Sequence, residues 1–224
     1  KEAAQRDNTQ FVDVFVGTGE HGHTFPGATR PYAMVQLSPD THLIGWDASS
    51  GYHYSDSVIY CFSHTHLSGT GIGDLGDVAI LPYTGADTLQ VPVASFKKED
   101  ESGEPGYYKV KLDNFGITAE LTSTERVGMH RYTYNQNDQR RVMLDLAHIL
   151  QPNWGHKVVS NNFTIIDDRT VSGTYHTQGW AHFHYVHYYI RFSEPAVNIT
   201  VRENGEAVDL PLRQMLAAGE QPLR

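Results

Sequence analysis

Glycine, histidine and aromatic side chains gather in three segments near the start of a chain that contains 13 histidines and 20 glycines. The first segment, residues 17–28 (GTGEHGHTFPGA), carries four glycines and Pro26. This composition predicts a tightly folded loop that presents His21, His23 and Phe25. A structural turn with solvated histidines is the alternative interpretation.

The second segment, residues 45–54 (GWDASSGYHY), places Trp46 directly before Asp47. An indole face packs against the C–H side of a sugar ring, and an adjacent carboxylate can accept hydrogen bonds from two hydroxyls. The pair therefore suits saccharide recognition. Packing of Trp46 in the hydrophobic core is the competing interpretation.

The third segment, residues 62–77 (FSHTHLSGTGIGDLGD), begins with a period of two that predicts His64 and His66 on one face of a strand. The glycine run that follows contains Asp74 and ends in Asp77. No lysine and no long helix follow the glycines, so a phosphate-binding loop is excluded.

Paired histidines one residue apart are common metal ligands, and His21 with His23 forms a second such pair beside His64 with His66. A zinc or iron site is therefore an alternative. Against it, a catalytic metal site usually needs a third ligand, and neither an HExxH motif nor a facial-triad spacing is present.

Composition and charge exclude several other functions. Asp and Glu number 26 against 17 Lys and Arg, for a net charge of -9, and no basic cluster is suited to nucleic acid. No apolar run approaches the roughly 20 residues of a membrane-spanning helix. Cys61 is the only cysteine, so no internal disulfide can form, and without a GxSxG motif nothing favours nucleophilic hydrolysis.

Most of the remaining chain alternates in steps of two. Tyr108, Val110 and Leu112 are apolar and are separated by lysines, which is typical of a half-buried strand. Similar patterns predict strands at residues 32–37, 58–63, 78–82, 117–121, 127–134, 142–146, 163–166, 170–175, 184–192 and 197–202. Many short strands at this spacing indicate an all-β sandwich or barrel.

Large side chains lie on both faces of the predicted strand 184–192, which favours a central position in a sheet. The one predicted helix begins at Pro211 and ends at Gly219. Residues 1–10 are expected to be a disordered or processed tail, and residues 11–224 a single domain. Solvated surface is expected for a group of acidic residues: Glu99, Asp100, Glu101 and Glu104.

Taken in order, the three segments resemble the signature blocks of the N-terminal domain of glycoside hydrolase family 92. The resemblance is carried by HGHTFPGA at 21–28, MVQLSPDT at 34–41, WD at 46–47, SGYHYSDS at 50–57 and the whole of 62–77. Residues 174–192, with a Gln-Gly-Trp sequence before the aromatic strand, extend it. Glu20 stands where the family usually has glycine, and Tyr32-Ala33 where it tends to have Phe-Gly.

The resemblance implies a large two-sheet antiparallel β-sandwich of the galactose-mutarotase-like supersandwich type, followed by an (α/α)6 helical domain. It also implies a calcium-dependent, inverting exo-α-mannosidase, whose acid and base flank the scissile bond roughly 6.5–9.5 Å apart. In the family those carboxylates and the calcium ligands belong to the helical domain. We therefore expect no catalytic residue and no cofactor in this chain alone, and no turnover by it.

What the resemblance carries over is a contribution of the first two loops to a mannose pocket, through His21, His23, Thr24, Phe25, Trp46 and Asp47. The third segment is expected to brace the domain interface, through His64, His66, Asp74 and Asp77. The implied partners are an α-1,2-linked mannoside or N-glycan-type substrate and the helical domain, in the periplasm or outside the cell. The exposed interface is expected to promote self-association.

Two other function classes fit the same residues. An autonomous carbohydrate-binding module would bind mannose through Trp46 without a partner domain. A stand-alone metalloprotein would use four histidines as ligands: His21, His23, His64 and His66.

Overall fold

The computed structural model describes residues 8–86, 90–135, 139–203 and 206–208. Regular structure in these residues is antiparallel β, with 3-10 turns of three residues between some strands. The turns are η1 (Thr9–Phe11), η2 (Trp46–Ala48), η3 (Lys98–Asp100) and η4 (Pro152–Trp154). The predicted all-β class is therefore confirmed, while the predicted helix at 211–219 and the first seven residues of the predicted tail lie outside the described residues.

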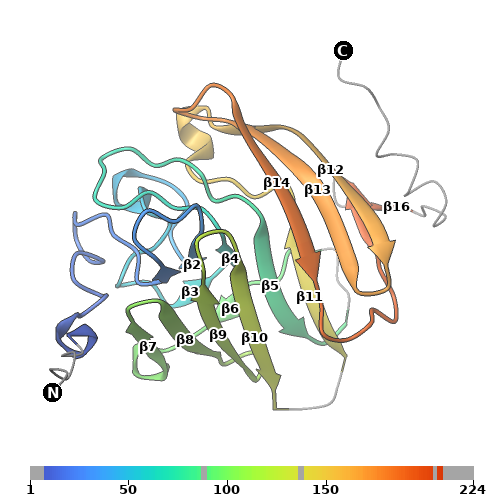
Figure 1. Cartoon of the computed structure of the whole chain (residues 1–224), viewed down its shortest axis with the longest axis horizontal. Helices are drawn as coiled ribbons and strands as arrows, with labels where there is room; N and C mark the ends of the chain where they lie inside the picture. The colour runs from blue at the N-terminus through green and yellow to red at the C-terminus, as the bar shows by residue number, and fades with distance from the viewer. Residues whose placement is uncertain (1–7, 87–89, 136–138, 204–205, 209–224) are drawn as a thin grey trace, which may run out of the picture.

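Two sheets enclose the hydrophobic core (Figure 1). One has the order β1-β2-β4-β5-β11 and the other the order β10-β9-β8-β7. The first consists of β1 (Ala28–Thr29), β2 (Gln36–Asp40), β4 (Cys61–Ser63), β5 (Ala79–Thr84) and β11 (Arg140–Asp145). The second consists of β7 (Glu101–Glu104), β8 (Tyr107–Leu112), β9 (Ile117–Ser123) and β10 (Gly128–Tyr134).

The alternation read from the sequence is what places residues in this core. Tyr108, Val110 and Leu112 of β8 are all fully buried, and they belong to one hydrophobic cluster with Leu37 and Phe62 of the opposite sheet. Each such aliphatic or aromatic side chain contributes about 2 kcal/mol when it leaves water. The two sheets are therefore held together by their inward-facing positions, as the period of two predicts.

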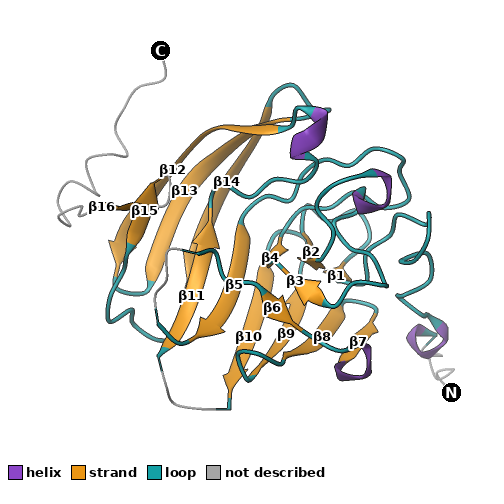
Figure 2. Cartoon of the chain, turned by 180° about the vertical axis from the view of Figure 1, so that it is seen from behind, coloured by secondary structure: helices purple, strands orange, loops and turns teal. Residues whose placement is uncertain are grey.

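A third sheet, of order β12-β13-β14, lies beside β5 and β11 (Figures 1 and 2). It is formed by β12 (Lys157–Asp167), β13 (Thr170–Gln178) and β14 (His184–Arg191). Two short strand pairs lie outside these three sheets: β3 (Val58–Ile59) with β6 (Ala94–Ser95), and β15 (Val201–Glu203) with β16 (Glu206–Val208). The Tyr175 hydroxyl donates to the His148 carbonyl, and the Asn161 amide donates to the Leu146 carbonyl at 2.8 Å. These bonds tie the third sheet to the segment that follows β11.

Several sequence-based predictions are wrong in detail. Tyr32 is not in a strand: its φ is +61° and its side chain is exposed, because the pairing of β2 begins only at Gln36. The strand predicted at 197–202 begins at Val201. Within the described residues β14 is an edge strand rather than a central one, since it pairs with β13 alone.

Glu101 also departs from expectation, because its side chain is 1% exposed rather than solvated. Its carboxylate accepts hydrogen bonds from the hydroxyls of Tyr108 (2.6 Å) and Tyr52 (3.0 Å) and from Nζ of Lys98 (3.0 Å). A buried carboxylate needs such donors to replace water. Tyr52 lies 49 positions away in the sequence, so the charged neighbours of Glu101 alone gave the wrong prediction.

Candidate functional site

The three glycine-rich segments come together at one end of the molecule, where the first leads into β1 and the other two follow β2 and β4 (Figures 1 and 2). The first loop folds back on itself at Gly22, where a Cβ would lie 2.1 Å from the carbonyl oxygen of Gly17. Only glycine fits this close approach. The backbone N–H of Thr24 then donates to the same Gly17 carbonyl at 3.2 Å, which closes the loop.

Two residues of the first loop other than glycine adopt a left-handed backbone. His23 has φ +56° and Glu20 has φ +49°. The positive φ of Glu20 explains why glycine would suit this position, because glycine adopts a left-handed backbone without steric cost. In His23 it turns the imidazole inward, where the side chain is almost fully buried.

The second loop is positioned by Gln151, which the sequence did not single out. Its side chain accepts from the N–H of Gly45 at 2.9 Å and donates to the Gly45 carbonyl at 2.7 Å. Gly45 has φ +102° and ψ 177°, a conformation open to glycine almost alone. This clamp fixes the backbone immediately before Trp46.

His23 is the point at which all three loops meet. Its Nδ1–H donates to the carbonyl of Thr70 at 2.7 Å, and its own carbonyl accepts from the N–H of Gly69 at 2.7 Å. Its ring lies edge-on to the Trp46 indole, with 5.0 Å between centroids. Trp46 in turn covers Gly71, where a Cβ would lie 2.8 Å from the indole. Residues more than 40 positions apart thus form one structural unit.

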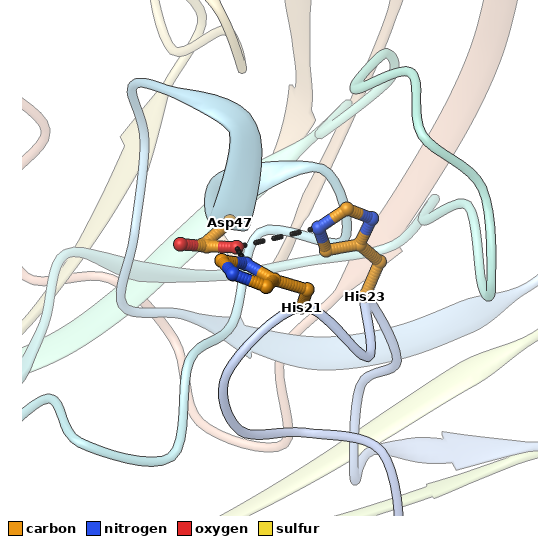
Figure 3. A group of neighbouring side chains, drawn as sticks. All are labelled: His21, His23 and Asp47. Atoms are coloured by element: carbon orange, nitrogen blue, oxygen red, sulfur yellow. Dashed lines mark hydrogen bonds and ion pairs between the residues drawn. The ribbon is translucent and has the colours of Figure 1, made fainter.

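A carboxylate from the second loop joins the two histidines of the first (Figure 3). Nδ1–H of His21 donates to Oδ1 of Asp47 at 2.7 Å, and Nε2 of His23 lies 3.4 Å from the same oxygen. The hydrogen bond and the charge of Asp47 raise the pKa of His21, and the hydrogen bond from His21 lowers the pKa of Asp47. Asp47 is therefore ionised at neutral pH and suits accepting hydroxyl hydrogen bonds rather than donating a proton.

Trp46 and Asp47 are both reachable from solvent. The Trp46 side chain is partly open, with 55% of the residue exposed, although its edges are held by His23 and Gly71. A partly exposed indole with fixed orientation beside an ionised carboxylate is an arrangement that recognises a polar ring with one apolar face. The core-packing interpretation of Trp46 is therefore wrong.

The other two predicted residues of the first loop support the fold of the site. Thr24 donates from its hydroxyl to the Val16 carbonyl at 3.0 Å. The Phe25 ring packs on His66, with 5.1 Å between ring centroids. Phe25 thereby links the first loop to the strand region beneath it.

His66 and His64 do not share a face as the period of two predicted, because β4 ends at Ser63. His66 donates through Nδ1 to the Gln36 carbonyl at 2.7 Å, and its Nε2 lies 2.6 Å from Oδ1 of Asp40. The carboxylate of Asp40 also binds Nε2 of His148 at 2.7 Å. This buried cluster lies below the loops rather than at the surface.

His64 belongs to a separate, partly buried chain of hydrogen bonds. Its Nδ1–H donates to the Val78 carbonyl at 2.7 Å, which leaves Nε2 of the neutral ring as an acceptor for His130, 3.1 Å away. The Tyr132 hydroxyl then donates to Nδ1 of His130 at 2.7 Å. Burial lowers the pKa of His64 to about 4 and that of His130 well below its ordinary value.

The two aspartates of the third segment contact the start of β14 and the turn before it. Asp77 binds Nε2 of His184 at 2.8 Å and accepts from the Thr65 hydroxyl at 2.6 Å. Asp74 accepts from the backbone N–H of Ala181 at 3.0 Å. Both carboxylates therefore link the loop after β4 to the third sheet.

The hypothesis of a metal site built from four histidines is wrong. His21 and His23 lie at the surface loops, whereas His64 is bonded to His130 and His66 to Asp40. The residues that sequence reasoning missed are Gln151, Thr70, Asp40 and His148.

No helix in the described part of the chain is of the length and apolar character that crossing a bilayer demands.

Comparison with known proteins gives a family assignment. The model of the glycosyl hydrolase family 92 N-terminal domain matches residues 11–219. A secreted glycosidase of uncharacterised activity from Arthroderma benhamiae is 34% identical over 142 residues, which is 59% of this chain and 18% of that protein.

Solved structures give the same picture. The family 92 α-mannosidase of Bacteroides thetaiotaomicron in complex with mannoimidazole superposes with a TM-score of 0.84 at 35% identity, covering 89% of this chain and 27% of that one. A second family 92 glycosyl hydrolase gives a TM-score of 0.76 at 27% identity, covering 91% and 29%. The chain thus spans less than a third of these relatives. With the family model matching from residue 11 to residue 219, this chain belongs to glycosyl hydrolase family 92, as its N-terminal domain.

Proposed function

We propose that this domain forms one wall of the mannose-binding cleft of an inverting exo-α-mannosidase that acts on α-1,2-linked mannosides, including those of N-glycans. The observation that carries the proposal is the convergence of three loops on His23, which holds Trp46 and Asp47 side by side and open to solvent. Its family membership and its similarity to a mannosidase structure with bound mannoimidazole support this role.

The residues have complementary tasks in this proposal. Trp46 would stack on the apolar face of the sugar ring, and Asp47 would accept hydrogen bonds from its hydroxyls. His21 orients the carboxylate through its hydrogen bond to Oδ1, and the His23 ring holds Trp46 edge-on. Thr24 and Phe25 hold the first loop in place, so we assign them an indirect part in binding.

We place the acid, the base and the calcium ion on a helical domain of a longer polypeptide. Glycoside inversion needs one protonated and one ionised carboxyl group across the scissile bond. The loop site offers Asp47, whose pKa is lowered, and this suits binding. Calcium prefers oxygen ligands. Two clusters of described residues could hold a metal, and each offers only one carboxylate beside imidazole or thiol groups. The first consists of His21, His23 and Asp47, and the second of Asp40, Cys61 and His148. These residues do not fit calcium.

The test compares a longer polypeptide carrying both domains with its Trp46→Ala variant in the hydrolysis of an aryl α-mannoside and of an α-1,2-mannobiose. We expect Trp46→Ala to lower kcat/KM by at least about tenfold, because burying a large apolar side chain against a ligand contributes about 1.5–3 kcal/mol. Trp180→Ala is the matched control, since Trp180 is also exposed but lies before β14. Equal effects of the two variants would reject the cleft role.

The division of labour is tested with the chain alone. We expect no calcium-stimulated hydrolysis of the aryl α-mannoside by residues 1–224. Robust turnover by the isolated chain would refute the placement of the acid and the base elsewhere.

An autonomous carbohydrate-binding module remains the second candidate, favoured by the solvent-open Trp46. It requires measurable mannose affinity of the isolated chain by calorimetry, weakened by Trp46→Ala. Absence of heat at millimolar mannose would remove this candidate and leave the cleft wall.

The similarity to a secreted glycosidase supports a location outside the cytoplasm for the whole protein.

A further inference from the structure

We propose that His21, His23 and Asp47 bind a divalent transition-metal ion of the zinc class. The ligand atoms offered by these three residues all lie within 4.8 Å of one another. Two imidazoles and one carboxylate form a donor set that suits zinc and its neighbours in the first transition row. The proposal goes beyond mannoside recognition and does not depend on it.

The protonation of His23 gives the first argument. Its Nδ1–H donates to the Thr70 carbonyl, which can only accept, so in the neutral ring Nε2 carries a lone pair. That nitrogen is buried, makes no hydrogen bond in the described structure and faces Oδ1 of Asp47 at 3.4 Å. A lone pair opposite a carboxylate oxygen is unfavourable unless a positive charge lies between them.

The distances provide the second argument. In a tetrahedral zinc site with bonds of about 2.0–2.1 Å, neighbouring ligand atoms are about 3.3 Å apart. The separation of Nε2 of His23 and Oδ1 of Asp47 is already 3.4 Å. The 2.7 Å hydrogen bond from His21 must lengthen, and this is inexpensive because the His21 side chain is 77% exposed.

The surroundings of His23 provide the third argument. A histidine that binds a metal usually donates its other ring N–H to a carbonyl or carboxylate, which fixes the tautomer and the ring orientation. His23 donates in this way to Thr70, and the N–H of Gly69 anchors its backbone. The nitrogen that faces Asp47 is therefore preorganised as a ligand before any ion arrives.

Binding can be written as a simple exchange. The ion bonds to Nε2 of His23, to a carboxylate oxygen of Asp47 and to Nδ1 of His21. The proton on Nδ1 of His21 moves to solvent, while Nε2 of the exposed ring keeps or takes up a proton. Three protein ligands leave a fourth position for water or another oxygen. His64 and His66 take no part, because their nitrogens are committed to His130 and Asp40.

The test is isothermal titration of the metal-free chain with zinc chloride in the absence of sugar, followed by visible absorption of the Co²⁺ complex. We expect one ion per chain, and Co²⁺ bands typical of imidazole ligands. Asp47→Asn and His21→Ala should each weaken zinc binding at least about tenfold. Because His21 is exposed, its alanine variant should keep the fold, which circular dichroism will verify.

His42→Ala is the matched control, since His42 and Asp56 form another solvent-accessible His–Asp pair, 3.2 Å apart, outside the proposed site. Its zinc affinity should equal that of the unaltered chain. The proposal is overturned if no 1:1 binding is seen, if Asp47→Asn and His21→Ala bind zinc as tightly as the unaltered chain, or if His42→Ala weakens binding equally. None of these outcomes bears on mannoside hydrolysis, so the two proposals fail separately.

Discussion

Nε2 of His148 lies 2.7 Å from the carboxylate of Asp40, a residue 108 positions earlier in the chain. Asp40 is fully buried at the end of β2 and also binds His66 at 2.6 Å and the Cys61 thiol at 3.3 Å. Burial alone would raise its pKa, but the charges and hydrogen bonds of His66 and His148 outweigh burial and hold the pKa well below its usual value. Asp40 therefore links strands and loops that are distant in sequence.

Replacement of Asp40 by asparagine should destabilise the fold strongly. Asp40→Asn keeps the shape but removes the negative charge that compensates two buried imidazoles, and breaking a buried pair costs about 3 kcal/mol or more. Urea denaturation will measure the loss. Asp113→Asn is the control, because its ion pair with Lys111 is solvent-accessible and such pairs contribute about 0–1 kcal/mol. Equal losses in the two variants would contradict the central role of Asp40.

The pair His64 and His130 should make the fold sensitive to mild acid. Burial lowers the pKa of His64 to about 4 and holds that of His130 well below 6.5. Between pH 6.5 and 4 these two histidines therefore bind protons in the unfolded chain but remain largely neutral in the folded chain. The stabilisation is complete above pH 6.5 and is lost as pH falls, by about 1.4 kcal/mol per unit for each group at most.

Other shifted groups act mainly outside this window. The pKa of His184 is raised by its hydrogen bond to Asp77, so its contribution changes above pH 6.5. Asp40, with its lowered pKa, loses its contribution below about pH 3.8. Urea denaturation at pH 7 and pH 4.5 should thus show a fall of at least about 2 kcal/mol, reduced in His130→Gln. An unchanged pH dependence in that variant would argue against the pair.

Two glycines of the first loop should respond differently to alanine. At Gly22 a Cβ would lie 2.1 Å from a backbone oxygen that cannot move alone, whereas at Gly19 the nearest atom is the Cβ of Tyr54 at 3.6 Å. We expect Gly22→Ala to lower the free energy of unfolding by more than about 2 kcal/mol and Gly19→Ala by less than about 1 kcal/mol. Thermal melts compare them directly, and a tolerated Gly22→Ala would disprove the close approach.

Gln151 should control the rigidity of the loop that carries Trp46. Gln151→Leu preserves volume but leaves the N–H and carbonyl of Gly45 without their partners, at a cost of about 1–3 kcal/mol. Hydrogen exchange should rise in peptides covering residues 43–54, the loop that Gln151 holds. It should stay constant in β8 and β9, which belong to the sheet of order β10-β9-β8-β7. Uniform exchange across both regions would mean that the clamp does not act locally.

Local patterns predicted much of the sandwich. The alternation in β8 and β9 marks buried positions such as Val110 and Leu121 correctly, because each strand records its own two faces. The position of β14 could not be read in this way. Large side chains on both faces indicate contacts but do not reveal whether a further strand pairs with the edge.

The residues of the candidate site also fall into those that the sequence could predict and those that it could not. Trp46, Asp47 and His23 could be singled out because glycine-rich loops with these side chains stand out locally. The clamp by Gln151 and the contact with Thr70 could not, because 106 and 47 residues separate the bonded partners. Likewise His64 and His66 look alike in sequence, and only the end of β4 at Ser63 sends them to different clusters.

The position of Cys61 has a practical consequence. Its sulfur is buried on β4, donates to Asp40 and has a pKa raised by burial and then by that carboxylate. A maleimide or disulfide reagent therefore meets this thiol only in molecules that have opened. As the chain has a single cysteine, the rate of labelling would report native-state opening without any introduced probe.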